Sequence, residues 1–487
     1  MGVIKRQGIK NTIATYIGFA IGFVNLLIIQ PQFLSKEELG LTRVLYSFSL
    51  LVAMFVPLGI GNATTRFFPL FKDDSRRHHG YLGFMLLFPL AGFILASGIL
   101  WLSKGWIMSR YAAESPLFNE FFHFVFPLVF FVSFLSVLSI YCSSNFKSTV
   151  PTYINDVLVR LLTIAVVSAY FVKWVDLPQF VGLFCGIYGF QMFALIGYIF
   201  YFDRPGFKVD WAYFRSKQVG HLVRYGLLLW FAGVASIGLK YFDAIMIGQY
   251  MPLAFVGIYT VAAFIPTIIE APLNAFDRIA SSKIAFAWQE GNMEEIRSIY
   301  QKSSLYMFLF GGLLFLNVNL NIDDLLGFLP KGYQDGASVV LILSTGSLFN
   351  MATGLNAAVL FTSEKYRYGA WFLIALAIVV VVLQALLIPL WGMNGAAMAT
   401  CLASFFYNGL LFWFVRKHFG LQPFGRENTL LLLLILVLFS IGYLIPSSGN
   451  PLVNILLKGT FVSGLYLGWV YRQNLAPEVF EWMKRNR

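Results

Sequence analysis

Long apolar runs recur along the whole chain, and short polar stretches that hold most of the charged residues separate them. A helix needs roughly 20 mostly apolar residues to cross the hydrocarbon core of a bilayer. About fourteen runs approach that length, near residues 12–30, 42–62, 81–102, 121–142, 156–173, 180–202, 223–243, 254–276, 303–320, 338–360, 369–390, 395–415, 429–445 and 452–471. The pattern predicts an all-α integral membrane protein with about fourteen transmembrane helices.

The composition agrees with a lipid environment. The chain of 487 residues is 58% hydrophobic and 12% charged, whereas soluble globular proteins carry about 25% charged residues. The net charge of +12 would suggest a nucleic-acid partner in a soluble protein. Here the charges fall in loops between apolar runs, so we expect a membrane protein that contacts lipid and does not bind nucleic acid.

The sequence offers no motif for a metal, a cofactor or a nucleotide. Cys142, Cys185 and Cys401 lie in or beside apolar runs, which is typical of small buried residues and not of disulfides or metal ligands. The five histidines include no pair with zinc-motif spacing, and no G-x-x-x-x-G-K-S/T sequence is present. We expect no catalytic residues, no cofactor and no built-in ATPase.

Lysine and arginine are distributed unevenly between alternate loops. If the N-terminus is cytoplasmic, the inside segments hold 25 of these residues and the outside loops hold 5. Cytoplasmic loops carry an excess of Lys and Arg, and a wrong span count would scramble the alternation. The asymmetry supports the span count and predicts a topology with both termini in the cytoplasm.

The two halves of the chain share a weak repeat. The segments from Phe33 to Leu41 and from Ile247 to Tyr259 each contain a short outer loop and a Gly-apolar entry, followed by a proline-bearing span. An even number of spans per copy predicts a pseudo-two-fold axis along the membrane normal, with a cavity between the copies. We expect a six-helix lobe at 1–202, a basic linker at 203–222, a second six-helix lobe at 223–415, and two further helices with a tail at 429–487. The linker lies along the membrane surface in one interpretation and is a simple positive-inside loop in the other.

Charged residues within spans are the candidates for function, because a charge at a helix centre costs at least about 2.5–3.5 kcal/mol. They are Arg43, Asp156, Arg160, Arg224, Lys240, Asp243, Glu270 and Lys458. Each has a structural alternative: end residues can snorkel, and residues one turn apart, such as Asp156 and Arg160, can neutralise each other. The excess of cations favours a phosphate-bearing substrate, because arginine binds phosphate in a bidentate manner.

Glu270 and Asp243 are the candidates for proton or sodium coupling. Glu270 lies deep in a span between Pro266 and Pro272. An acid buried in a span can cycle between protonated and ionised forms.

The chain resembles the Wzx-type polysaccharide flippases of the multidrug/oligosaccharidyl-lipid/polysaccharide exporter (MOP) superfamily over almost its whole length. Four segments carry the resemblance: Lys10-Asn11-Thr12 with the Leu34 to Gly40 loop; Leu58-Gly59-Ile60-Gly61-Asn62 leading to Arg66; Asp243 to Gly248 with Val256-Gly257-Ile258-Tyr259; and Gly392-Met393-Asn394-Gly395-Ala396-Ala397-Met398-Ala399.

The resemblance implies two six-helix lobes around a central cavity, two added C-terminal helices, alternating access, and an undecaprenyl-pyrophosphate-linked oligosaccharide as substrate. It also implies that basic residues line the cavity, at positions comparable to Arg43, Arg66, Arg160, Arg224 and Lys240. Polysaccharide assembly proteins would then be partners. Two alternatives remain: an ion-coupled drug antiporter of the same fold, and a membrane-embedded polysaccharide polymerase or ligase, for which no large outer loop is present.

Overall fold

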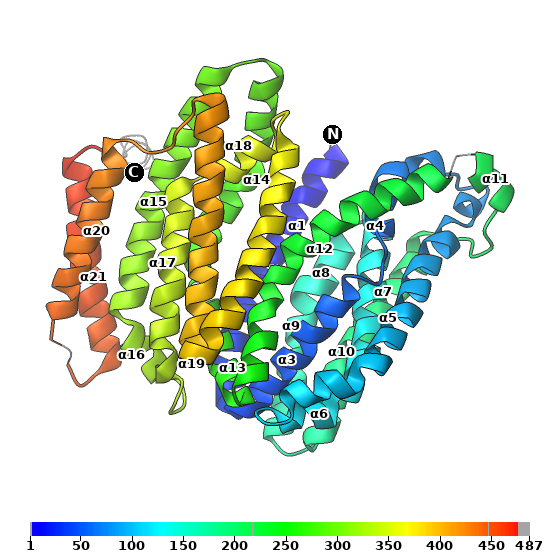
Figure 1. Cartoon of the computed structure of the whole chain (residues 1–487), viewed down its shortest axis with the longest axis horizontal. Helices are drawn as coiled ribbons and strands as arrows, with labels where there is room; N and C mark the ends of the chain where they lie inside the picture. The colour runs from blue at the N-terminus through cyan, green and yellow to red at the C-terminus, as the bar shows by residue number, and fades with distance from the viewer. Residues whose placement is uncertain (1, 217–218, 447, 476–487) are drawn as a thin grey trace. The chain divides into compact units, whose positions relative to one another are not determined.

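A computed structural model describes residues 2–216, 219–446 and 448–475, and within these ranges every regular element is helical (Figure 1). The side chains of residues 2–6, 9, 216, 219, 221, 225, 228–229, 231–240, 274–275 and 278–279 lie outside the description. Each apolar run predicted to span the membrane is mostly helical. The all-α membrane fold is confirmed, and eleven of the described helices are long and apolar enough to cross a bilayer.

The described residues form two compact units by their contacts, Met1–Gly257 and Ile258–Arg487. The main elements of the first unit are α1 (Gly2–Val24), η1 (Asn25–Ile29), α2 (Gln30–Phe33), α3 (Lys36–Ala53), α4 (Ile60–Phe67), η3 (Arg77–Gly80), α5 (Tyr81–Tyr111), α6 (Pro116–Phe121), α7 (Val125–Ser144), α8 (Thr149–Tyr153), η5 (Ile154–Leu158), α9 (Val159–Phe171), α10 (Leu177–Phe202), α11 (Trp211–Ser216) and α12 (Val219–Tyr250). The six-helix lobes expected from the repeat stay a prediction.

Within the first unit, α7 packs against α3, α4, α5 and α10, and α12 packs against α3 and α4. The helices begin where the sequence supplies caps: Ser35 caps α3 in a reciprocal pair with Glu38, and Asp176 caps α10 with Gln179. At the contact of α4 with α12, a β-carbon on Gly59 would overlap the backbone of Gly226. Glycine at position 59 therefore permits both its left-handed φ of 77° and this close approach.

The second unit is built around α15 (Met293–Leu320), which packs against α14 (Thr267–Gln289), α17 (Ala337–Thr353), α20 (Arg426–Leu444) and α21 (Pro451–Arg472). The other elements are the end of α13 (Leu253–Phe264), α16 (Ile322–Gly327), η6 (Gln334–Gly336), α18 (Asn356–Phe361) and α19 (Tyr366–Phe419). The C-terminal hairpin is held by polar contacts as well as apolar ones, since Tyr466 donates a hydrogen bond to the carbonyl of Leu309 at 2.9 Å.

The helices differ from the predicted spans in several places. The run at 42–62 is broken between α3 and α4, where Pro57 lacks an N–H and Leu58 and Gly59 take positive φ angles of 48° and 77°. The stretch 277–302, which lies between two predicted spans, is mostly helical: α14 and α15 extend into it, and Lys283 of α14 pairs with Glu295 of α15 at 3.2 Å. The runs at 369–390 and 395–415 form the single α19, which bends at Gly392 (φ 55°). The count of fourteen spans stays a prediction.

The predicted topology can be tested by cysteine labelling, because the native Cys142, Cys185 and Cys401 are all buried. Exposed positions exist in loops assigned to opposite sides: Ser75 inside and Lys331 outside. In intact cells, a membrane-impermeant maleimide should label Lys331→Cys and leave Ser75→Cys unmodified until the cells are permeabilised. The reverse pattern would contradict the topology.

Candidate substrate-binding site

The first helix of the chain and the helix formed by residues 149–171 each contain a π-helical turn, and these parts pack together. The first π turn is η1 and the second is η5, and η5 contacts α1 while η1 contacts α9. A π turn inserts one extra residue into a helix and is frequent at functional sites. It re-aims the side chains that follow, and Arg160 follows directly after η5.

Arg160 lies against a glycine face of α1. A β-carbon on Gly22 would lie 2.9 Å from its Nε and 3.0 Å from its Cζ, and one on Gly18 would lie 2.8 Å from its Nη1. Glycine at both positions therefore makes room for the guanidinium. The Nη1 atom is buried and has no hydrogen-bond partner in the protein.

A salt bridge between Asp156 and Arg160, the structural alternative for these two residues, is absent among the described residues. The carboxylate of Asp156 accepts a hydrogen bond from Thr15 Oγ1 at 2.9 Å. The two residues still interact electrostatically. Because no salt bridge occupies Arg160, its buried N–H donor is available to an anion.

Arg43 lies in a second polar cluster of the same unit, on α3. Its Nη2 donates to Gln30 Oε1 at 3.1 Å, while its Nε is buried without a hydrogen-bond partner. Three tyrosines interact with it electrostatically, and they come from three helices: Tyr46 on α3, Tyr188 on α10 and Tyr241 on α12. The ring of Tyr46 stacks on Tyr188 at 5.1 Å and meets Tyr241 edge to face at 6.1 Å.

The guanidinium groups of Arg43 and Arg160 both lie against the helix formed by residues 2–33. Arg160 contacts this helix at Gly22, and Arg43 contacts it at Gln30. Eight residues at a helical rise of 1.5 Å separate these contact points by about 12 Å. The arrangement therefore presents two cationic positions in series, each with a buried donor that lacks a partner.

The other predicted site residues are placed differently. Arg66 ends α4, is exposed, and lies over the ring of Phe67 at 5.4 Å. Arg224 is exposed on α12, and the side chain of Lys240 lies outside the described residues. Asp243 is half-buried on α12 in the first unit, whereas Glu270 is half-buried in the first turn of α14 in the second unit.

Sequence reasoning missed the neutral part of the site. Gln30, Tyr46, Tyr188 and Tyr241 carry no charge, and each lies in or next to an apolar run. One signal was present: Arg43 and Tyr46 are three residues apart and so share a helix face. The sequence pattern does not predict that three helices pack together at the face that holds Arg43 and Tyr46.

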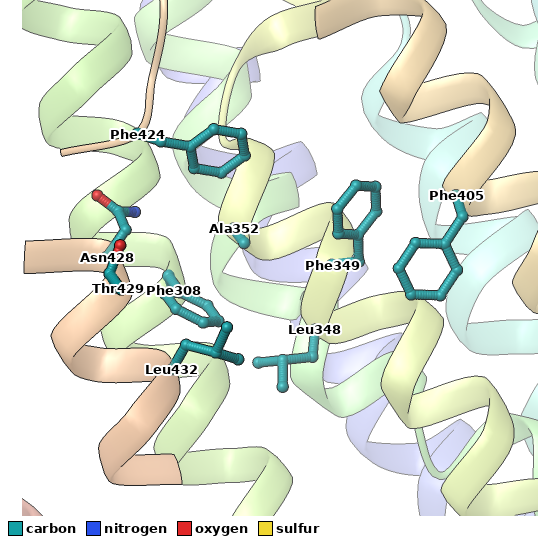
Figure 2. Close-up of a pocket in the computed structure, with 9 residues that line it drawn as sticks. All are labelled: Phe308, Leu348, Phe349, Ala352, Phe405, Phe424, Asn428, Thr429 and Leu432. Carbon is teal, nitrogen blue, oxygen red and sulfur yellow. The ribbon is translucent and has the colours of Figure 1, made fainter. Parts of the chain in front are cut away.

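The second unit holds a cavity of about 350 Å³ next to α20. Figure 2 shows phenylalanine rings and aliphatic side chains around it; the lining residues are Phe308, Leu348, Phe349, Ala352, Phe405, Phe424, Asn428, Thr429 and Leu432. The amide of Asn428 is already engaged, because it donates to Ser304 Oγ at 3.0 Å and accepts from the N–H of Gly425 at 3.1 Å. The cavity therefore offers a mainly apolar surface to an occupant.

Comparison with known proteins identifies the family. A family model described as "Polysaccharide biosynthesis protein" matches residues 4–278, which is more than half of the chain. The chain belongs to the polysaccharide biosynthesis protein family. The match covers both clusters that hold Arg43 and Arg160.

Relatives of this family member agree in fold. It is 22% identical to an uncharacterised membrane protein of Methanocaldococcus jannaschii over 472 residues, which is 89% of this chain and 88% of that protein. Its structure is similar to lipid II flippase MurJ in an inward closed conformation, with a TM-score of 0.74, 14% identity, and coverage of 96% of this chain and 100% of that one. It is also similar to an inward-facing multidrug resistance MATE family transporter of the MOP superfamily, with a TM-score of 0.66, 13% identity, and coverage of 85% and 98%.

The predicted resemblance is confirmed at the level of the polysaccharide biosynthesis protein family, and the two solved structures share its fold. Together with the apolar helices, they show a multi-pass membrane protein with a transporter fold.

Proposed function

We propose that this protein flips an undecaprenyl-pyrophosphate-linked oligosaccharide across the bacterial inner membrane by alternating access, for surface polysaccharide synthesis. One observation carries the proposal: Arg43 and Arg160, both within predicted membrane spans, have buried N–H donors without hydrogen-bond partners. An unused buried donor costs free energy, so its retention in a membrane helix favours a role with an anionic ligand.

A pyrophosphate head group needs such donors. A dianion cannot enter a low-dielectric region without compensating charge, and guanidinium supplies both charge and paired donors. In this proposal, Arg160 and Arg43 contact the pyrophosphate in succession, since they lie about 12 Å apart along the first helix. Arg66, Arg224 and Lys240 are further basic positions for the same head group.

The lipid part of the substrate needs an apolar surface. The cavity beside α20 has a mainly apolar lining, and its buried amide is satisfied by the protein. Sugars and phosphates would lose hydrogen bonds to water there, whereas a hydrocarbon chain would not. We therefore assign this cavity to an isoprenoid segment of the substrate.

Filling the cavity should reduce transport. Leu432 lines it from α20 and is 45% exposed, so a tryptophan there can enter the cavity without a clash in the helix core. We expect Leu432→Trp to lower surface polysaccharide roughly threefold or more, at normal protein abundance, because it occupies volume that the chain would use. Leu433→Trp is the matched control, since Leu433 is 54% exposed and does not line the cavity. Equal polysaccharide levels in the two variants would remove the cavity from the proposal.

Glu270 and Asp243 are the proposed coupling carboxylates. Glu270 is half-buried in α14, which carries Pro272 within the helix. If a proton or sodium ion drives transport through Glu270, then Glu270→Gln should abolish the dependence of transport on the ion gradient, because glutamine cannot titrate. The check is the flipping rate in proteoliposomes with and without a pH or sodium gradient. An unchanged gradient dependence would exclude Glu270 and leave Asp243 to be tested in the same way.

A drug antiporter of the same fold is the second candidate, and the similarity to a MATE family transporter favours it. Gene deletion separates the two functions. A flippase deletion should accumulate lipid-linked oligosaccharide on the inner leaflet, with its synthesis intact and surface polysaccharide lost. Normal surface polysaccharide in the deletion strain, together with increased sensitivity to cationic drugs, would support the antiporter and reject the flippase.

A further inference from the structure

A cluster of histidines and aspartates lies at one end of the first unit, away from the arginine site. It joins the loop before α5 to the segment that follows α10, and it comprises His78, His79, Asp73, Asp203 and Asp210. We call it the His–Asp clasp. It is independent of the transported substrate and involves neither Arg43 nor Arg160.

The loop half of the clasp has a strained backbone. Arg77, His78 and His79 take φ angles of 49°, 54° and 53°, and Gly80 follows with 73°. Residues with a β-carbon rarely occupy this left-handed region, and consecutive ones are rarer because each one adds strain. Such a run persists only where surrounding contacts hold it, and strain of this kind is frequent at switch regions.

The segment after α10 supplies those contacts. The N–H of Gly206 donates to the carbonyl of Arg77 at 3.4 Å, and the N–H of Asp210 donates to the carbonyl of His79 at 3.1 Å. A β-carbon on Gly80 would overlap the carbonyl of Lys208, so the two segments are in close contact. Residues 203–213, within the predicted linker, are therefore fastened to the first unit.

His79 is placed between two carboxylates. Its Nδ1 lies 3.4 Å from Asp210 Oδ2, its Nε2 lies 3.7 Å from Asp73 Oδ2, and its side chain is buried. Its ring stacks on Tyr213 of α11, with centroids 3.6 Å apart and an interplanar angle of 1°. Only the imidazolium form can donate from both nitrogens, whereas the neutral ring turns one lone pair toward a carboxylate.

His78, unlike His79, has one ring nitrogen that accepts a hydrogen bond from the backbone. Its Nδ1 accepts the N–H of Asp73 at 3.1 Å, so that nitrogen must be unprotonated. Its Nε2 then faces Asp203 at 3.4 Å and Asp74 at 3.7 Å, and Tyr141 donates to the same oxygen of Asp203 at 2.6 Å. His78 therefore fixes the turn as a neutral ring, and His79 is the residue whose proton adds a contact to the linker.

Asp73 and Asp210 stay ionised in neutral and mildly acidic solution, because the pKa of each is lowered. Hydrogen bonds from the Ser75 hydroxyl and from the N–H of Arg76 lower the pKa of Asp73, and the charge of His79 contributes. The N–H of Tyr213 lowers the pKa of Asp210, with a further contribution from His79. A lowered carboxyl pKa means that their contribution is lost only in acid, below the ordinary value of about 4.

The remaining charges near the clasp are exposed side chains on the same two segments. They are Lys72, Asp74, Arg76, Arg77, Arg204, Lys208 and Arg215. Elsewhere the neighbouring side chains are uncharged aromatic groups, such as Phe68, whose ring meets His78 edge to face at 5.5 Å. Among the groups of the clasp, the His79 imidazole is therefore the one whose protonation changes the contacts with residues 203–213.

We propose that the His–Asp clasp is a proton-operated latch, which fastens residues 203–213 to the start of α5 when His79 is protonated and releases them when it is neutral. Because these residues lead into α11 and α12, the latch sets how freely the chain between α10 and α12 moves. The physical basis is the loss of a charge-assisted hydrogen bond on deprotonation.

Hydrogen–deuterium exchange of the full chain in lipid nanodiscs tests the latch. After correction for the intrinsic exchange rate, protection of the amides in residues 203–213 should fall about tenfold between pH 6 and pH 8.5. His79→Gln should give low protection at both pH values. His79→Arg, which is always charged, should give high protection at both. His123→Gln is the matched control, because His123 is exposed and its Nδ1 contacts only the carbonyl of Glu120 among the described hydrogen bonds.

A second variant distinguishes loss of the latch from misfolding of the loop. Asp210→Asn keeps the imidazole and its stacking partner but removes one carboxylate, so it should lower protection at pH 6 and flatten the pH response. Protection in the wild-type chain that does not change with pH would overturn the latch. So would a His79→Gln variant, or an Asp210→Asn variant, that retains the wild-type pH response.

Discussion

Replacing Arg160 with alanine should reduce surface polysaccharide at least about tenfold, whereas lysine at this position should retain part of it. The charge survives in lysine, but the planar fork that binds phosphate in a bidentate manner does not. The guanidinium has a buried Nη1 without a partner and makes no described salt bridge, so its loss does not leave a carboxylate without its ion pair. The measurement is surface polysaccharide per unit of protein in a complemented deletion strain.

The control for this substitution is Arg110→Ala. Arg110 is exposed at the end of α5 and lies over the ring of Trp106 at 5.3 Å. It should change polysaccharide less than about twofold, as surface substitutions usually do. If Arg160→Ala and Arg110→Ala behave alike at equal abundance, Arg160 is not part of the substrate path.

Leucine at Gly22 should reproduce the effect of removing Arg160 while Arg160 is still present. A β-carbon at position 22 meets the Nε, Cζ and Cδ atoms of Arg160 at 2.9, 3.0 and 3.2 Å, all of them in a flexible side chain. The helix can therefore accept the new residue by displacing the guanidinium. We expect a loss of polysaccharide of roughly tenfold at near-normal abundance.

Substitutions at two other glycines serve as comparisons for Gly22→Leu. Gly98→Leu on α5 is the neutral control, because a β-carbon there meets no atom within 4 Å. Gly18→Ala should instead lower protein abundance, since its β-carbon would lie 2.5 Å from the carbonyl oxygen of Asp156, which is backbone. Wild-type polysaccharide in Gly22→Leu would show that the position of Arg160 against α1 is unimportant for transport.

The helical fold was largely predictable from hydropathy alone. Each apolar run near 20 residues is mostly helical, because a chain in lipid must satisfy its backbone hydrogen bonds internally. The break between α3 and α4 was less accessible: Pro57 indicated a kink, but the positive φ of Leu58 depends on how the chain packs. The extension of α14 and α15 into 277–302 could not be predicted from hydropathy, because polar helices outside the membrane lack an apolar run.

Only the charged residues of the candidate substrate-binding site were predictable from the sequence. Arg43 and Arg160 stood out because a charge within a span is costly. Their environment was not predictable, since it depends on two π turns, on the glycine face of α1, and on tyrosines from three helices. The absence of a salt bridge between Asp156 and Arg160 among the described residues has the same cause, because Thr15 comes from another helix and binds the carboxylate.

The most direct test of the central claim is flipping by the purified protein. Proteoliposomes would contain a fluorescent undecaprenyl-pyrophosphate-linked oligosaccharide, and a membrane-impermeant glycosidase would report the fraction exposed on the outer leaflet over time. With the wild-type protein, the inner-leaflet pool should also become cleavable, while vesicles with Arg160→Ala should stay near the level of protein-free vesicles. A protected pool of the same size with and without the wild-type protein would contradict the account.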